Sequence, residues 1–264
     1  MIKLYELLKE QVGQPKAIIL AGAPGAGKGY VLKGLDLGNV KVLNVDNRYI
    51  DNLKKANVSL DLKNSSPEDR SKQAIAMSQA NKDFDKDVED TIKAKESFIL
   101  DGTAASYKKT VELKNELEEA GYEVFMLYVY TDLERSLKQN QDRFEKSGGE
   151  DRSLMPAIVL STWNKVTQNH KPYKDLFKDN FVSVANTLED EKIDNLEDII
   201  TKYLTPFKPK NTKPKTAARQ RYADKQRDKQ NKEVKGLLDG GAEEIINTSV
   251  SADEARAKIN MFLK

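Results

Sequence analysis

The residues with the clearest chemistry form a glycine-rich run that reads Gly-Ala-Pro-Gly-Ala-Gly-Lys. Its spacing is that of a Walker A loop, in which backbone N–H groups surround a phosphate and a lysine adds a positive charge. An ordinary glycine-rich turn is the alternative. The apolar run 17–21 before the loop and the helical pattern after it favour phosphate binding. The residues expected to bind a nucleotide are Gly22, Ala23, Pro24, Gly25, Ala26, Gly27, Lys28, Gly29 and Tyr30.

One position of the loop departs from this pattern. The Ser or Thr that usually follows the lysine to hold Mg²⁺ is absent, and Gly29 and Tyr30 stand there instead. Mg²⁺ would then be held mainly through water and a carboxylate elsewhere, or its binding would be weakened. The departure is the main sequence feature that weighs against catalysis.

Phosphoryl transfer also needs a group that orients the attacking hydroxyl. Asp46 follows an apolar run and could accept the proton of that hydroxyl as a general base. Its alternative role is to cap the following helix. Arg48 could hold a phosphate of the acceptor, or form a surface ion pair.

A second acid ends another apolar run, in Phe98-Ile-Leu-Asp-Gly-Thr. Asp101 stands where a Walker B acid holds Mg²⁺, directly or through water. A helix cap is the alternative reading for this residue. Thr103, two residues later, is a candidate substrate ligand.

The charged segment 139–152 contains Arg143, Arg152 and the pair Gly148-Gly149. Glycine hinges and arginines are typical of lids that close over a phosphate, where an arginine stabilises the charge that develops during transfer. A solvated loop of mixed charge is the alternative.

Apolar runs and helical patterns alternate along the chain up to residue 205. Strands are expected over 16–21, 41–45, 97–101, 122–130 and 181–185. Helices are expected over 3–12, 28–35, 66–95, 106–120, 133–146, 156–168 and 188–204. This order predicts a three-layer α/β P-loop kinase fold with a five-stranded parallel sheet, whose strand ends bring the loop, Asp46 and Asp101 together.

Composition narrows the class of protein further. The 264 residues include no cysteine, which excludes disulfides and thiolate metal sites, and a single histidine, His170, which cannot form a zinc site alone. No apolar run reaches the roughly 20 residues of a membrane span. We therefore expect a cytoplasmic protein that does not contact membranes. Trp163 is expected on the packing face of its helix.

The last 59 residues differ from the rest. Segment 206–235 carries 11 Lys or Arg against 3 Asp or Glu, a net charge of +8 within a chain of +2. It is predicted to be a flexible linker that could bind nucleic acid or an acidic partner. Segment 236–264 is predicted to be a small helical module, in which Ser251 and Glu254 form a capping box. Apolar residues that could dock a protein partner there are Leu237, Leu238, Ile245, Ile246, Ile259, Phe262 and Leu263.

Taken together, the Walker A loop, Asn44-Val-Asp46, Ile99-Leu-Asp-Gly-Thr103, Gly121-Tyr-Glu-Val and the arginine-bearing lid resemble zeta-toxin-type P-loop kinases over about residues 15–186. The resemblance implies ATP and Mg²⁺ as cofactors, Asp46 as general base, and phosphate contacts by the two lid arginines. It implies a metal or substrate role for Asp101, although zeta toxins tend to carry Glu there. Phage-type polynucleotide kinases are also similar through Asn44, Asp46 and Arg48.

Three functions remain open from the sequence. The first is an ATP-dependent kinase acting on a hydroxyl of a small nucleotide-like or sugar molecule, with Lys28, Asp46, Arg143 and Arg152 as catalytic residues. The second is a polynucleotide 5′-hydroxyl kinase, suggested by the basic linker. The third is a non-catalytic nucleotide-binding assembly protein, suggested by the missing hydroxyl after Lys28.

Overall fold

The computed structural model describes residues 13–187, apart from 36, 38, 39, 63 and 64, together with 225–226, 228–229, 232–237 and 242–263. The helices expected over 3–12 and 188–204 lie outside these ranges, as does most of the basic segment. None of the helices within them is long and apolar enough to cross a membrane.

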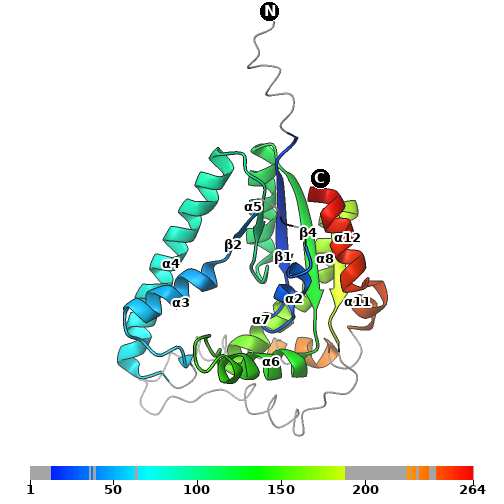
Figure 1. The fold of residues 1–264 in the computed structure, drawn as a ribbon. Coiled ribbons are helices and arrows are strands. Elements are labelled where there is room, and N and C mark those ends of the chain that lie inside the picture. Colours follow the sequence, from blue (N-terminus) through cyan, green and yellow to red (C-terminus); the bar gives the residue numbers. More distant parts are fainter. Residues whose placement is uncertain are drawn as a thin grey trace, which may run out of the picture.

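Five parallel strands form one sheet at the centre of the molecule (Figure 1). The strands are β1 (Lys16–Ala21), β2 (Lys41–Leu43), β3 (Phe98–Leu100), β4 (Glu123–Tyr130) and β5 (Phe181–Ala185). Their order is β2-β3-β1-β4-β5, and Ile18 of β1 lies opposite Ile99 of β3 and Phe125 of β4. The predicted five-stranded parallel sheet is confirmed. Because β1 lies between β3 and β4, the loop that follows β1 emerges beside the residues that follow those strands.

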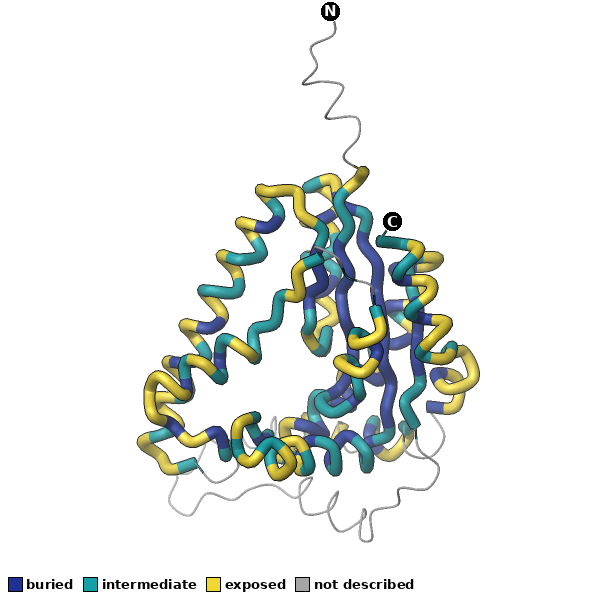
Figure 2. The backbone as a smooth tube through the Cα atoms, in the orientation of Figure 1, coloured by how far each residue is buried: buried dark blue, intermediate teal, exposed yellow. Residues whose placement is uncertain are grey.

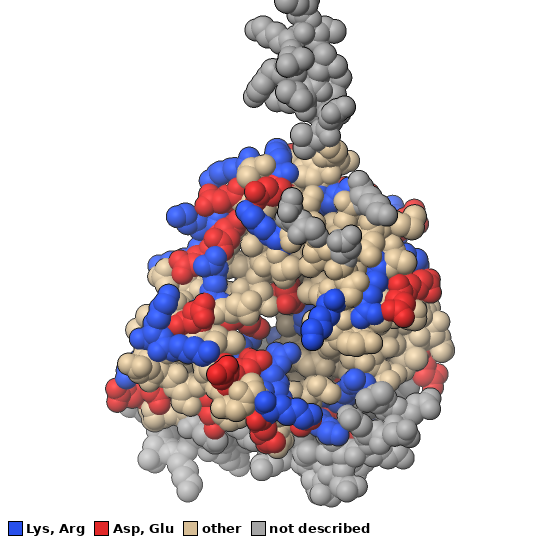
Figure 3. Space-filling model, viewed as in Figure 1, with Lys and Arg blue, Asp and Glu red and all other residues tan. Residues whose placement is uncertain are grey.

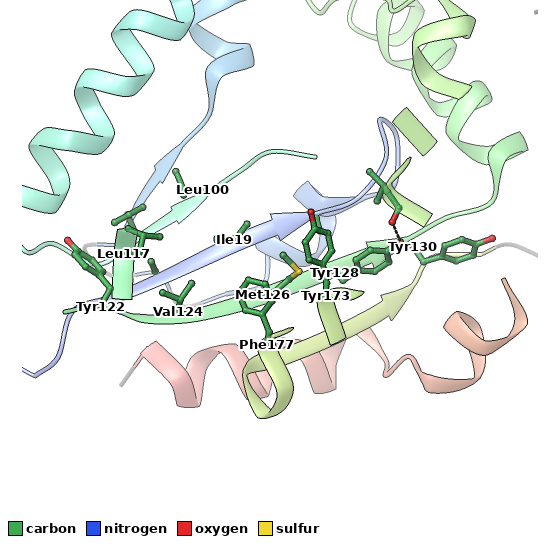
Figure 4. Close-up of a cluster of buried hydrophobic side chains, with 14 of the residues drawn as sticks. Ile19, Leu100, Leu117, Tyr122, Val124, Met126, Tyr128, Tyr130, Tyr173 and Phe177 are labelled. Atoms are coloured by element: carbon green, nitrogen blue, oxygen red, sulfur yellow. Dashed lines mark hydrogen bonds between the residues drawn. The ribbon is translucent and has the colours of Figure 1, made fainter. Parts of the chain in front are cut away.

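Successive side chains of the strands enter two separate cores, one on each face of the sheet. Ile19 and Met126 belong to the first core, and Leu20 and Leu127 belong to the second. Figure 4 shows the first core, in which Leu117, Tyr173 and other helical side chains cover the strands. Helices contribute to the first core from α5 (Tyr107–Glu119) and α8 (His170–Phe177), and to the second from α2 (Lys28–Leu32) and α12 (Ala252–Leu263). The result is the expected three-layer arrangement.

Two helices after β4 have the bounds that the sequence predicted, α6 (Leu133–Lys146) and α7 (Pro156–Gln168). Trp163 of α7 is 1% exposed, and its Nε1 donates a hydrogen bond of 2.8 Å to the carbonyl oxygen of Thr131. The prediction that Trp163 packs in the core is confirmed. This contact anchors α7 to the segment between β4 and α6.

Helices α3 (Val45–Lys55) and α4 (Pro67–Lys93) form an arm that extends beside the sheet (Figures 1 and 2). The predicted start of α4 is confirmed, because Ser66 Oγ accepts a hydrogen bond of 3.0 Å from the N–H of Asp69. The expectation that the second strand extends to Val45 is wrong. Asn44 caps a new helix there, since its Oδ1 accepts a 2.6 Å hydrogen bond from the N–H of Asp46.

The C-terminal helix α12 packs on the sheet. Val250 pairs with Val184 of β5, and Ala255 and Ile259 of α12 are both 0% exposed in the second core. The predicted cap is present, because Ser251 Oγ accepts a 3.1 Å hydrogen bond from the N–H of Glu254. Two of the apolar side chains that the sequence offered to a protein partner are covered by the chain itself, Ile259 and Ile245 of α11 (Glu243–Thr248), whereas Ile246 is 39% exposed and Leu238 lies outside the described residues.

Candidate active site

The phosphate loop connects β1 to α2 and is held open by two glycines with positive φ. Gly25 has φ 76° and Gly27 has φ 89°, values that residues with a Cβ rarely adopt. A Cβ on Gly27 would also collide with the side-chain amide of Asn186, which donates a 2.9 Å hydrogen bond to the carbonyl oxygen of Ala26. The residues after β5 therefore support the loop from outside.

Lys28 is folded back over this loop. Its Nζ donates hydrogen bonds to the carbonyl oxygens of Gly22, at 3.0 Å, and Ala23, at 3.3 Å. Burial lowers the pKa of Lys28, while the nearby carboxylate of Asp101 opposes this shift. Arg143 also lowers the pKa and Asp46 also raises it, so three charged side chains predicted for the site act on one ammonium group. Each of these positions follows a different strand or helix, as the topology requires.

The structure explains how the chain accommodates the unusual residues after Lys28. A Cβ built on Gly29 would meet no atom within 4 Å, so no steric feature of the described residues excludes a serine or threonine there. Tyr30 is 65% exposed, and its ring lies beneath the guanidinium of Arg256 at 4.9 Å. The missing hydroxyl is therefore a change of chemistry at a position that has room for one.

Asn44 links the two acids of the site. Its Oδ1 accepts the hydrogen bond from the N–H of Asp46, and its Nδ2 donates a 2.7 Å hydrogen bond to Oδ2 of Asp101. Asp101 in turn is fixed at the end of β3, because its N–H donates to the carbonyl oxygen of Leu43 at 2.9 Å. One side chain thus sets the start of α3 and the orientation of the Asp101 carboxylate. The capping role suggested as an alternative for Asp46 is performed by Asn44.

Arg152 contacts Asp46 directly. An Nη2 of Arg152 lies 2.6 Å from Oδ1 of Asp46, and only 14% of the arginine side chain is exposed. The guanidinium also lies over the ring of Tyr49, 5.7 Å from its centroid. Tyr49 is 5% exposed and burial raises its pKa, so it remains a neutral platform at physiological pH.

The other lid arginine lies closer to solvent. Arg143 Nε is 3.4 Å from a carboxylate oxygen of Asp151, with 54% of the arginine side chain exposed. Between these residues Gly148 has φ 64° and Gly149 has φ 85°, so the predicted glycine turn has the backbone conformation that glycine favours. Arg143 is therefore placed near Lys28 by α6 itself, whereas Arg152 is brought to Asp46 by the segment that follows α6.

The two predicted substrate ligands have different surroundings. Arg48 forms an ion pair with Asp87 of α4, which is the surface pair that the sequence left open. Thr103 lies beside the phosphate loop, because its carbonyl oxygen accepts a 3.2 Å hydrogen bond from the N–H of Gly22. The position of Thr103 is thus consistent with the site, but this contact is made by its backbone and not by its hydroxyl.

Figure 3 shows that this face of the molecule is hollowed at its centre, with acidic and basic side chains around the opening. Two hydrogen bonds link the arm to the segment that follows α6. Ser153 Oγ donates a 2.9 Å hydrogen bond to Oδ1 of Asp61, and its N–H donates to the carbonyl oxygen of Leu60 at 3.2 Å. Phe144 of α6 packs against the same arm.

The donor set near the loop fits Mg²⁺ only in part. Within the described ranges no three His, Asp or Glu side chains gather into a metal site. Mg²⁺ usually requires one or two carboxylates together with phosphate oxygens and water, and Asp101 supplies one such carboxylate. The hydroxyl that would complete the usual set is missing at Gly29.

Two polar residues of α6 were not among the site residues predicted from the sequence, and one of them borders the loop. Ser136 of α6 donates a 2.6 Å hydrogen bond from Oγ to the carbonyl oxygen of Pro24. Its neighbour Arg135 has Nε and Nη1 buried without a hydrogen-bond partner, an arrangement that buried polar groups seldom keep. Neither residue belongs to a local sequence motif. Each can be identified only from its position in the folded chain. The arginine is an additional candidate for contact with a bound nucleotide.

Residues 3–192 match the protein family described as Zeta toxin. A search of curated protein sequences finds no match.

Solved structures show the same fold at low identity. The native AvrRxo1-ORF1:-ORF2 complex aligns with a TM-score of 0.52 and 18% identity, covering 71% of this chain and 59% of that chain. The same complex with ATP aligns with a TM-score of 0.50 and 14% identity, covering 98% of this chain and 84% of that one. A structure from the PezAT toxin–antitoxin system of Streptococcus pneumoniae has 16% identity over 66% of this chain and 68% of that chain, with a TM-score of 0.45.

Proposed function

This chain belongs to the zeta toxin family of ATP-dependent P-loop kinases, and from that premise we propose that it phosphorylates a hydroxyl of a small nucleotide-like or sugar molecule. The observation that carries the proposal is the contact of Asp46 with Asn44 on one side and Arg152 on the other. An acid, a hydrogen-bonded linker to Asp101 and a lid cation are thereby assembled beside Lys28, as hydroxyl phosphorylation requires.

Each residue of the site has a separate role in the proposed reaction. The loop and Lys28 hold the β- and γ-phosphates of ATP. Asp46 accepts the proton of the acceptor hydroxyl. At the same time the hydroxyl oxygen bonds to the γ-phosphorus and the bond from that phosphorus to the bridging β-phosphate oxygen breaks, which gives ADP and a phosphate ester. Lys28, Arg143 and Arg152 stabilise the charge on the transferring group. Mg²⁺, when bound, would neutralise phosphate charge, and Asp101 is the residue that would hold it.

The link between the arm and the segment after α6 supports a small acceptor. Ser153 is hydrogen-bonded to Asp61 and Phe144 packs on the arm, so these parts of the chain are joined. A polynucleotide strand could not pass between them, whereas a small molecule would not need to. The basic segment 206–235 remains the reason to test a polynucleotide acceptor as well.

The decisive experiment supplies γ-labelled ATP and two acceptor pools, one of small metabolites and one of 5′-hydroxyl oligonucleotides. We expect label in the metabolite pool. Label in the oligonucleotide pool alone would favour the polynucleotide kinase, and ATP binding without transfer to either pool would favour a non-catalytic role.

Two variants of α3 identify the base. Asp46→Asn should reduce transfer by roughly 10²–10⁴-fold while ATP affinity stays nearly unchanged, because only the proton acceptor is lost. Asp51→Asn makes the same chemical change at an exposed position of α3 and should retain full activity. Undiminished transfer by Asp46→Asn would remove the proposed base.

A further inference from the structure

Helix α2 presents Lys28 to the phosphates, yet its own sequence provides little stability. It has five residues, one of which is Gly29, and it has no side-chain cap at its start and no basic residue in its last turn. Helices of this length are marginal in isolation, and an interior glycine costs about 1 kcal/mol relative to alanine. Contacts from elsewhere in the chain must therefore hold α2 in place.

Helix α12, more than 200 residues later, provides those contacts. Val31 of α2 is 1% exposed and belongs to the same core as Ala255 and Ile259 of α12. Figure 1 shows α12 lying along the sheet on the side from which α2 projects. The apolar packing fixes how the two helices approach, but it does not satisfy the carbonyl groups that the short helix leaves free.

Arg256 of α12 satisfies two of those carbonyl groups. Its Nη2 donates a 2.7 Å hydrogen bond to the carbonyl oxygen of Tyr30, and its Nε donates one of 3.1 Å to that of Val31. A cation near the carbonyl end of a helix is favourable. Hydrogen bonds that carbonyl groups accept from a charged donor are also stronger than those from a neutral donor. The second Nη is held by Asp253, at 2.6 Å.

Two residues in and after α2 fit this arginine, Tyr30 through its ring and Gly34 through its lack of a side chain. The ring of Tyr30 lies under the guanidinium at 4.9 Å, in the geometry of a cation–π contact. A Cβ on Gly34 would lie 2.5 Å from Nε of Arg256, so any larger residue there would displace the guanidinium. Tyr30, one of the two residues that depart from the Walker A pattern, thus contacts Arg256 specifically.

We infer that Arg256 is a positioning residue of the nucleotide site: it anchors the carbonyl end of α2 and thereby keeps Lys28 and the loop N–H groups in place for ATP. Arg256 touches no substrate in this role, because it acts through α2. The inference rests on ATP binding by the loop, and it is independent of which acceptor is phosphorylated.

The test measures ATP affinity by calorimetry on the full chain, at a temperature where circular dichroism shows every variant to be folded. Arg256→Gln should weaken ATP binding roughly fivefold or more. Lys258→Gln removes one charge from the same helix, where Lys258 Nζ lies 3.5 Å from a carboxylate oxygen of Glu254. That control should bind ATP within about twofold of the wild type, as expected for a surface charge.

Gly34→Ala approaches the same contact from the other side. The added methyl group should displace the guanidinium and weaken ATP binding in the same direction as Arg256→Gln, and the double variant should be no weaker than the stronger single one. A lower melting temperature of Arg256→Gln with unchanged ATP affinity would overturn the inference. Absence of ATP binding by the wild-type chain would refute the loop assignment itself, whereas lost acceptor labelling with normal ATP binding would affect only the proposed acceptor.

Discussion

The guanidinium of Arg152 lies 2.6 Å from the carboxylate of Asp46, so the lid's cation and the proposed base neutralise each other. While this ion pair lasts, Oδ1 of Asp46 is occupied by the guanidinium. We expect the arginine to shift toward the transferring phosphate, so that this oxygen can meet the acceptor hydroxyl. The contact of Arg152 with Asp46 thus connects the position of the lid to the availability of the Asp46 carboxylate for the acceptor hydroxyl.

Replacing Arg152 should separate these two effects. Arg152→Gln frees Asp46 but removes a charge from the transition state, and we expect the second effect to dominate with a loss in kcat of roughly 10³-fold. Affinity for ATP should change far less. Rapid-quench measurement of phosphoryl transfer tests this, with Arg70→Gln on the exposed surface of α4 as the control. A kcat above that of the wild type would mean that the pair serves mainly to restrain Asp46.

Restoring the missing hydroxyl should strengthen the use of Mg²⁺. Gly29 lies in open space within α2, so Gly29→Ser should fold normally and lower the Mg²⁺ concentration needed for half-maximal activity severalfold. Gly29→Ala is the matched control, because it improves helix propensity by up to about 1 kcal/mol without adding a ligand. Equal Mg²⁺ dependence of the two variants would show that the serine does not reach the ion.

Stability should depend on the protonation of His170. This residue is 3% exposed, with ring contacts to Tyr128 and Phe181, and burial, assisted by the charge of Lys174 and opposed by Glu244, lowers its pKa to about 4. The unfolded chain binds this proton near pH 6.5, so between those values it holds more protons than the folded chain.

Folding stability should consequently fall as pH decreases from 6.5 toward 4, by at most about 1.4 kcal/mol per pH unit from this group. Urea unfolding at pH 7 and pH 5 measures the change. Carboxylates also titrate in this range, so the informative quantity is the difference between the wild type and His170→Gln. A variant that loses as much stability as the wild type on acidification would exclude His170 as the cause.

The link between arm and lid should affect the acceptor more than ATP. Ser153→Ala removes the hydrogen bond to Asp61, and we expect a severalfold increase in the KM of the acceptor with the KM of ATP unchanged. Steady-state kinetics with each substrate varied in turn measures both values. Ser78→Ala, at an exposed position of α4, is the control. An increase confined to the KM of ATP would contradict the assignment of the hollow to the acceptor.

Much of the fold could be predicted because strands and helices here differ in the period of their apolar residues. The buried strand β1 before the loop, the capped start of α4 at Ser66 and the bounds of α6 and α7 all follow from local patterns. The bounds of helix α3 could not be predicted, because a polar helix that begins at Val45, almost directly after a three-residue strand, shows no change of period.

Contacts between distant segments could not be predicted from local patterns. The apolar face of α12 is equally compatible with a partner and with the chain's own sheet, and only the structure shows that Ile259 is covered. The same applies to the pairing of Arg152 with Asp46, since a lid arginine in the sequence does not reveal its contact. Local patterns identify candidate groups, whereas the fold decides their partners.

The contact of α6 with the phosphate loop has a mechanical consequence. Ser136 is bonded to Pro24, and a Cβ on Gly25 would lie 2.9 Å from Cβ of Gln139, so the first turns of α6 and the loop form one block. Rotation of the lid can begin only beyond α6, at the glycine pair after Lys146. Arg143 then stays in place with α6, while Arg152 moves with the segment beyond it. The first arginine is therefore a fixed positive charge at the site, and the second is a mobile one.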